Sequence, residues 1–470
     1  MNRIVPLILA VALFMENMDS TVISTALPAI AADLQVGPIT LKLALTAYMV
    51  SLAIFIPVSG WMADKFGAKR IFRAAIIVFT VGSILCAISG SLWAFVAARF
   101  LQGMGGAMMT PVGRLVLLRT TKREELVSAM ALLTIPGLVG PLAGPPVGGF
   151  ITTYFTWHWI FLINVPISIL GLILSSIYLP EIEKLKTPPL DVIGLVLTAL
   201  CAAGIVFGLS VISLPALPPA IGVGATIIGF LCGFGYFFHA RRHPAPLLNL
   251  ALFRKPAFRA AQTGGTLFRI STGAIPFLMP LMLQLGFGMT PFESGMTTFV
   301  GAIGAITTKF MARRMFAAAG FRTVLITAGL AGAATTYVNA VFTPQTPHLV
   351  IMFFLLMAGF FRSFFFTGTN ALGYSDIDNT EASQATSIAS VLQQVSLALG
   401  VACAAFVLEV STAITGSELG LPQFHLGFLV VATLSLASVI PYILLDKNAG
   451  SDVSGHRRAA VAAAENIPVK

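Results

Sequence analysis

Charged side chains are scarce in this chain. Asp, Glu, Lys and Arg make up only 10% of its 470 residues, whereas soluble domains carry about a quarter. Hydrophobic residues account for 57%, and the mean hydropathy is +0.91. A water-soluble fold could not bury that much apolar surface, but a polytopic membrane protein exposes it to lipid. The composition therefore predicts a chain embedded in a bilayer.

Cysteines and motifs for covalent chemistry are also few. The four cysteines lie far apart inside apolar runs and lack metal-ligand spacing, which indicates small buried side chains. No nucleotide-binding loop, nucleophile–base pair or metal cluster is recognisable in the sequence. We therefore expect a protein that is not an enzyme, has no cofactor or metal, and is not driven by ATP. The net charge of +10 is spread over short loops between apolar runs, which indicates a lipid bilayer as partner and no nucleic acid.

Apolar runs of spanning length recur along the whole chain. A helix needs about 20 residues to cross the ~30 Å of hydrocarbon. This criterion predicts an all-α protein of about fourteen transmembrane helices. The expected ranges are 5–30, 41–63, 71–90, 93–118, 127–152, 157–179, 191–211, 218–239, 259–285, 293–316, 321–343, 348–373, 384–411 and 424–445.

Basic residues collect in alternate loops, which predicts the orientation by the positive-inside rule. With the N-terminus in the cytoplasm and an even number of spans, nearly all basic loops and the C-terminus are cytoplasmic, and the opposite loops hold only Lys42. The N-terminal run carries two acids and no cleavage site, so it is predicted to be a retained span in the cell inner membrane. We expect a six-helix bundle over 1–180, two linking helices and a loop over 181–258, a second six-helix bundle over 259–446, and a tail over 447–470. An echo of GAKR at 67–70 by GFRT at 320–323 weakly suggests two related halves.

Two carboxylates interrupt the first apolar run. Glu16 and Asp19 are one turn apart on one helix face, near mid-membrane. Two close carboxylates in a low dielectric resist double ionisation, so one can hold a proton. Arg99 has no acid in its own expected helix, and the first helix is the nearest supplier. The three residues are therefore candidates for proton coupling, with a purely structural ion pair as the alternative.

Two other segments carry patterns that suggest conformational roles. GWMADKFGAKR contains Gly60, Asp64 and Gly67 and the basic pair Lys69 and Arg70, which could form a gate network or merely set topology. IPGLVGPLAGPPVGGF has small residues every three or four positions, which predicts a flat face for close helix packing. Its prolines remove intrahelical hydrogen bonds and bend the helix. The residues concerned are Gly140, Pro141, Gly144, Pro145, Gly148 and Gly149.

Five segments together resemble the major facilitator superfamily, and in particular its fourteen-helix drug:H⁺ antiporter branch. They are MDSTVISTALP, GWMADKFGAKR, the R-x-x-Q-G-x-G pattern from Arg99 to Gly105, the glycine–proline helix, and WHWIFLINVP, where His158 replaces the usual arginine. The resemblance covers nearly the whole chain. It implies two six-helix bundles around a central cavity, two extra central helices, alternating access, and Asp19 in the acidic position of the first helix.

The sequence leaves two transport functions open. One is proton-driven export of small molecules such as drugs, for which aromatic residues such as Phe365 could line a promiscuous cavity. The alternative is export of an organic anion or metal-carboxylate, citrate-like metabolite, because guanidinium groups match carboxylates. Arg269 and Arg362 could instead snorkel toward the helix ends. The candidate substrate residues are Gln102, Arg114, Arg269, Arg362 and Phe365, and the expected assembly is a monomer.

Overall fold

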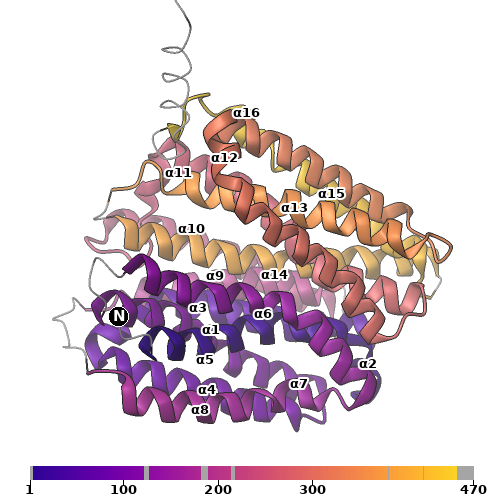
Figure 1. Cartoon of the computed structure of the whole chain (residues 1–470), viewed down its shortest axis with the longest axis horizontal. Helices are drawn as coiled ribbons and strands as arrows, with labels where there is room; N and C mark the ends of the chain where they lie inside the picture. The colour runs from indigo at the N-terminus through magenta and orange to yellow at the C-terminus, as the bar shows by residue number, and fades with distance from the viewer. Residues whose placement is uncertain are drawn as a thin grey trace, which may run out of the picture.

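The computed structural model describes residues 4–120, 126–181, 189–212, 217–378, 381–416 and 418–451. Over these ranges the chain is helical and contains no strand. Eleven helices within them are long and apolar enough to cross a membrane by length and composition. Most of the long helices lie side by side, as Figure 1 shows, with the N-terminal helices at the bottom and α11, α12, α13 and α15 at the top. The basic loop residues at 121–125 and 182–188 and the tail after 451 lie outside the described residues.

The N-terminal half begins with a helix that is broken near its end. The expected span 5–30 consists of α1, a single 3₁₀ turn and the short helix α2, so the chain bends before it reaches the next span. We call the end of the molecule where α1 starts the Ile4 side, and the end where α3 starts the Pro38 side. The helices of this half are α1 (Ile4–Val22), α2 (Leu27–Asp33), α3 (Lys42–Phe66), α4 (Ala68–Ala87), α5 (Leu92–Thr120), α6 (Leu126–Tyr154), α7 (His158–Leu162) and α8 (Asn164–Tyr178).

Two helices connect this half to the next one. They pack against each other as an antiparallel pair, and the first of them also contacts α3 and α14. The remaining helices form the C-terminal half, in which α11 packs on α13, α14 and α15. The bounds are α9 (Val192–Val211), α10 (Pro219–Arg242), α11 (Pro256–Leu281), α12 (Pro291–Val338), α13 (His348–Gly373), α14 (Ala382–Thr415), α15 (Leu421–Ala437) and α16 (Ile440–Ile443).

Each expected span falls on helical backbone, but 157–179 is divided between α7 and α8, and one helix contains two expected spans. Eleven stretches meet the spanning criterion among the described residues, and 93–118, 127–152 and 293–316 are not among them. The ranges 293–316 and 321–343 are merged in α12, but its backbone is non-helical at Gly320, with φ 70° and ψ 166°. Gly67, between α3 and α4, also has a positive φ, of 98°. A side chain would strain either position. The faint sequence echo between 67–70 and 320–323 therefore corresponds to two glycine turns of related geometry.

The glycine-rich helix α6 makes the close contacts that its sequence predicts. A Cβ added at Gly140 would lie 2.9 Å from the carbonyl oxygen of Phe14, and one at Gly148 would lie 2.2 Å from that of Val22. Phe14 lies in the middle of α1 and Val22 is its last residue, so the backbones of α1 and α6 are in contact. Gly149 faces elsewhere, because its Cβ would lie 2.4 Å from the carbonyl oxygen of Pro291 at the start of α12. Helix α6 thus packs closely on both halves.

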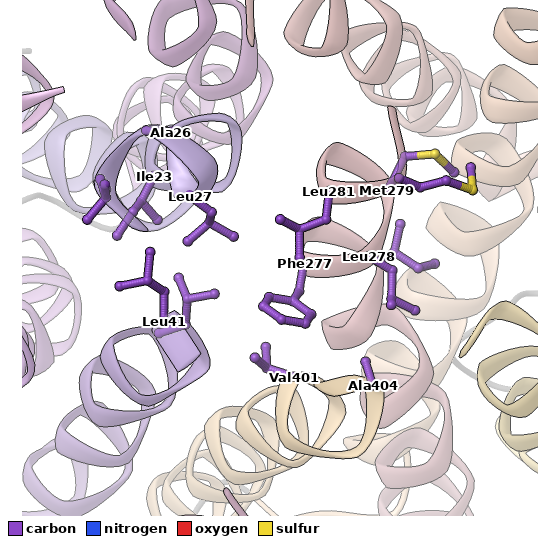
Figure 2. Packing of buried hydrophobic residues seen from close by; sticks show 14 of the residues in the cluster. Ile23, Ala26, Leu27, Leu41, Phe277, Leu278, Met279, Leu281, Val401 and Ala404 are labelled. Atoms are coloured by element: carbon purple, nitrogen blue, oxygen red, sulfur yellow. The ribbon is translucent and has the colours of Figure 1, made fainter. Parts of the chain in front are cut away.

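Apolar side chains from both halves meet at the Pro38 side. Figure 2 shows part of this buried cluster, with Ile23, Leu27 and Leu41 on one side and Phe277 and Leu281 on the other. These five residues are completely buried. Val401 and Ala404 of α14 lie beneath them. The two halves are therefore sealed against each other at this end.

The packing of α6 predicts opposite effects for two glycine substitutions. Gly148→Ala should destabilise the protein by about 1–3 kcal/mol, because its Cβ would collide with backbone that cannot rotate away. Gly224→Ala is the matched control, since nothing lies within 4 Å of the added Cβ and alanine favours a helix. Thermal unfolding of the purified protein in detergent measures both. Equal midpoints for the two variants would contradict the close contact.

Candidate functional site

A polar network is buried among α1, α4, α5 and α8. The Asp19 carboxylate accepts hydrogen bonds from Arg99 Nη1 at 2.7 Å, Gln102 Nε2 at 2.9 Å and Asn164 Nδ2 at 2.7 Å. Gln102 Nε2 also donates to Ser83 Oγ at 2.8 Å. All five side chains are buried, and Asp19 and Gln102 have no exposed surface. The ion pair that the sequence suggested between the first helix and Arg99 is therefore present, and it joins α1 to α5 with neutral amides around it.

The glycines that follow Arg99 allow the backbone of α5 to pack closely against α3 and α4. A Cβ at Gly103 would lie 2.6 Å from the carbonyl oxygen of Tyr48 in α3, and one at Gly105 would lie 2.4 Å from the backbone nitrogen of Phe79 in α4. Helix α5 thus contacts backbone on two sides. The Arg99 guanidinium also lies over the Tyr48 ring, 4.3 Å from its centroid, which is a favourable cation–π geometry. Sequence spacing and packing together place the arginine beside Asp19.

Glu16 occupies a different environment from Asp19 although the two are one turn apart. Its carboxylate accepts a hydrogen bond from Thr110 Oγ1 of α5 at 2.5 Å, and the charge of Arg114 also acts on it. The side chain is partly exposed, whereas Asp19 is fully buried. The two acids are therefore not equivalent. In this conformation Asp19 is paired with Arg99, and Glu16 is the less buried residue of the two.

A second intramembrane ion pair connects the two halves at the Pro38 side. Lys42, the first residue of α3, donates to the Glu409 carboxylate of α14. Lys42 is fully buried and Glu409 nearly so. The sequence predicts Lys42 in a loop on the side opposite the basic loops. In the structure it follows the 3₁₀ turn Pro38–Leu41 as the first residue of α3 and is buried in the interface.

The loop between α3 and α4 differs in part from its predicted network. Asp64 pairs with Arg119 Nη2 of α5 at 2.6 Å, and this partner replaces the predicted pairing with Lys69 or Arg70. Gly67 makes the tight turn that was expected of it. Gly60 does not allow a close helix approach here, because nothing lies within 4 Å of a Cβ at that position.

The predicted substrate residues lie in contrasting places. Arg269 of α11 is 2% exposed, so it does not snorkel. Its guanidinium reaches Gln262 Oε1 and Asn370 Oδ1, each at 3.4 Å, and no carboxylate lies within 4.0 Å of it among the described residues. Arg114 is exposed, and Arg362 donates from Nε to the Ala358 carbonyl of its own helix at 3.0 Å.

Two of the predicted substrate residues have no solvent-accessible surface in this structure. Phe365 is fully buried in the second half, where its ring stacks on Phe268 with centroids 4.3 Å apart. Gln102 is fully buried in the Asp19 network. Contact of either side chain with substrate would require a different conformation. Three residues that bond to this site were not identified from the sequence: Ser83 and Asn164 in the Asp19 network, and Thr110, which donates to Glu16. Only Asn164 had a signal, since it lies in the segment WHWIFLINVP.

The chain is similar to known membrane transporters. A family model described as Major Facilitator Superfamily matches residues 9–239. A protein of Yersinia enterocolitica named "Putative multidrug resistance protein MdtD" is 36% identical over 403 residues, covering 86% of each chain. The structure superposes on the POT family transporter PepTSo with a TM-score of 0.70 over 97% of this chain and 99% of that one, at 13% identity. A D-xylose–proton symporter gives 0.68 over 95% and 98%, at 14% identity.

The buried network predicts strong coupling between Asp19 and Arg99. Asp19→Asn and Arg99→Gln should each destabilise the protein by about 3–5 kcal/mol, because each leaves one buried charge without its partner. The double variant should cost clearly less than the sum of the two. Denaturant unfolding in micelles measures the cycle. Asp64→Asn serves as the control, because that ion pair is partly exposed and should contribute at most about 1 kcal/mol. Additive effects at Asp19 and Arg99 would contradict the coupling.

Proposed function

The chain belongs to the major facilitator superfamily, and we propose that it exports small molecules, drugs among them, in exchange for protons by alternating access. Identity of 36% over 86% of the chain establishes the family, and the protein is a multi-pass membrane transporter. The relative's name assigns that protein to multidrug resistance. The observation that carries the proton coupling is the pair of non-equivalent acids on α1.

The proton step that we propose uses Glu16 as the group that gains and loses a proton. Glu16 as a residue is only partly buried, and its carboxylate is held by a hydroxyl, so it can bind a proton without breaking an ion pair. Asp19 is engaged by three donors, including Arg99, and orients the helix that carries Glu16. A protonated Glu16 needs no counter-charge in a low dielectric. Proton entry would supply ~2.3 kcal/mol per 100 mV and about 1.4 kcal/mol per pH unit.

The contacts between the halves support alternating access. At the Pro38 side the halves are joined by the apolar cluster, the Lys42–Glu409 pair and the α6–α12 contact. A transporter must separate these contacts to open that side. We propose that the Ile4 side faces the cytoplasm in the inner membrane, that both termini lie there, and that this conformation is closed to the outside. The division into bundles at 1–180 and 259–446, a linking segment and a tail belongs to the same proposal, as does a monomeric state.

A variant of Glu16 tests the proton step. Glu16→Gln should abolish pH-driven accumulation of a lipophilic cationic dye such as ethidium in inverted membrane vesicles, because the amide cannot take up a proton. Its thermal midpoint should stay near that of the parent protein, since Thr110 can still bond to the amide oxygen. Counterflow without a pH gradient should persist.

The matched control for that experiment is Glu418→Gln, which removes an exposed acid from the loop before α15. This variant should transport like the parent protein. Full pH-driven accumulation by Glu16→Gln would refute the assignment of the proton to Glu16. If Asp19→Asn also kept full activity, the entire acid pair would be excluded from coupling.

A second candidate function is export of an organic anion. It is favoured by one observation, the buried guanidinium of Arg269 with only amide oxygens within hydrogen-bonding distance among the described residues. A buried charge without a partner is costly, and a substrate carboxylate between α11 and α13 would compensate it. Arginine binds carboxylates in a bidentate geometry.

Arg269 therefore distinguishes the two candidate substrates. If anions are carried, Arg269→Gln should lower citrate flux in inverted vesicles by at least about tenfold, because the substrate loses a charged hydrogen bond. The dye flux should change little. Arg254→Gln is the control, since it removes an exposed arginine near the start of α11. Unchanged citrate flux in Arg269→Gln, or no citrate flux in the parent protein, would exclude the anion function.

A further inference from the structure

Three side chains of metal-ligand type meet where α9 begins and α10 ends. Asp191 immediately precedes α9, while His239 and His243 lie in and just after the last turn of α10. Because the two helices form an antiparallel pair, these ends are adjacent. One ligand atom from each residue lies within 4.8 Å of the others. The cluster is separate from the Asp19 network and from Arg269.

The Asp191 carboxylate is fixed in place by backbone donors. Its side chain is 3% exposed. Oδ1 accepts from the Gly194 nitrogen at 2.8 Å, which caps α9, and Oδ2 accepts from the Leu247 nitrogen at 3.1 Å. A carboxylate oxygen has more than one lone pair, so both contacts leave capacity for a cation. Such backbone bonds orient ligands in metal sites.

The two histidines complete a set that can converge on one ion. His239 Nε2 lies 2.7 Å from Asp191 Oδ1, and the centroids of the two imidazole rings are 5.1 Å apart. His243 Nδ1 takes only a 3.3 Å contact from the Ala245 nitrogen. Both rings border an open hollow of about 300 Å³, which leaves space for water as a further ligand. The hollow is lined by Phe238, His239, Arg242, His243 and Pro244.

We propose that Asp191, His239 and His243 bind a divalent transition-metal ion, with Zn²⁺ as the representative. Two imidazoles and one carboxylate suit zinc, cobalt or nickel, whereas magnesium and calcium prefer oxygen ligands alone. Ligand atoms about 2.0–2.2 Å from an ion are roughly 3.3 Å apart in a tetrahedron. The His239 ring therefore has to move slightly away from Asp191 and the His243 ring toward it. Arg242 opposes the cation, but its side chain is exposed and its charge is screened by water.

A bound ion would stabilise the contact between α9, α10 and the segment that leads to α11. Leu247 already bonds to Asp191, and the next residue, Leu248, exchanges two hydrogen bonds with the Tyr236 hydroxyl, at 2.8 and 2.6 Å. This segment leads to α11, which starts at Pro256. The ion would connect the start of α9, the end of α10 and this segment. It is a stabilising site and not the transported substrate.

Zinc titration of the full-length protein tests the site. The protein is purified in detergent, its affinity tag is removed, and Cys201 and Cys232 are replaced by Ser, because thiols on the same helices also bind zinc. Calorimetry with ZnCl₂ should show one saturable site. His243→Ala should weaken it at least about tenfold and leave the fold intact, because its hydrogen bond is weak. His348→Ala removes an exposed histidine at the start of α13 and should change nothing.

Spectroscopy identifies the ligands independently of affinity. Cu²⁺ bound to the same protein should give electron paramagnetic resonance with coupling to two imidazole nitrogens, and to one nitrogen in His243→Ala. Asp191→Asn alone is less informative, since it removes the cap of α9 as well. The proposal is overturned if no saturable binding occurs at millimolar zinc, or if His239→Gln and His243→Ala both bind as tightly as the parent protein. In either case the cluster is only an aspartate–histidine hydrogen bond.

Discussion

The structure of the first half depends on one buried ion pair. Asp19 and Arg99 are both buried where a single charge would be costly, so each one stabilises the other. Helix α5, which carries Arg99, contacts α3 and α4 at backbone distance, and Gly103 and Gly105 permit these contacts. The amides of Gln102 and Asn164 then satisfy the remaining capacity of the carboxylate. One electrostatic requirement thus explains why small residues and amides occupy these positions.

The contacts within the first half and those between the halves differ in kind. Within the half, charges are buried with several hydrogen bonds each, and opening that network would leave polar atoms unpaired. Between the halves at the Pro38 side, the described residues form apolar contacts, glycine contacts, the Lys42–Glu409 pair and two hydrogen bonds, from Gln284 Nε2 to the Thr25 carbonyl and from the Phe292 nitrogen to Thr153 Oγ1. Apolar surfaces and glycine backbones can separate and reform with little loss of specific bonding. A rigid-body movement of one half against the other is therefore less costly than deformation inside a half.

Much of the fold was predictable because spanning length and apolarity are local properties. The expected ranges matched long helices, and the separation of 293–316 from 321–343 survives as a turn at Gly320. The Asp19–Arg99 pair was also predictable, since a buried arginine needs an acid. The other long-range partners were not predictable. Arg119 for Asp64, Thr110 for Glu16 and Glu409 for Lys42 come from helices far away in sequence, and nothing in spacing shows which faces will meet. For the same reason Phe365 was expected in a cavity and is packed in a core.

The buried arginines of the two halves have different kinds of partner. In the first half Arg99 is neutralised by Asp19 on a neighbouring helix. In the second half, the hydrogen-bond partners of Arg269 among the described residues are the amide oxygens of Gln262 and Asn370 at 3.4 Å, and these carry no formal charge. An internal partner makes the first arginine a structural element of its half. The second arginine keeps a charge that an anionic ligand could neutralise. This asymmetry is the reason why we propose the proton step for the first half and selection of substrate charge for the second.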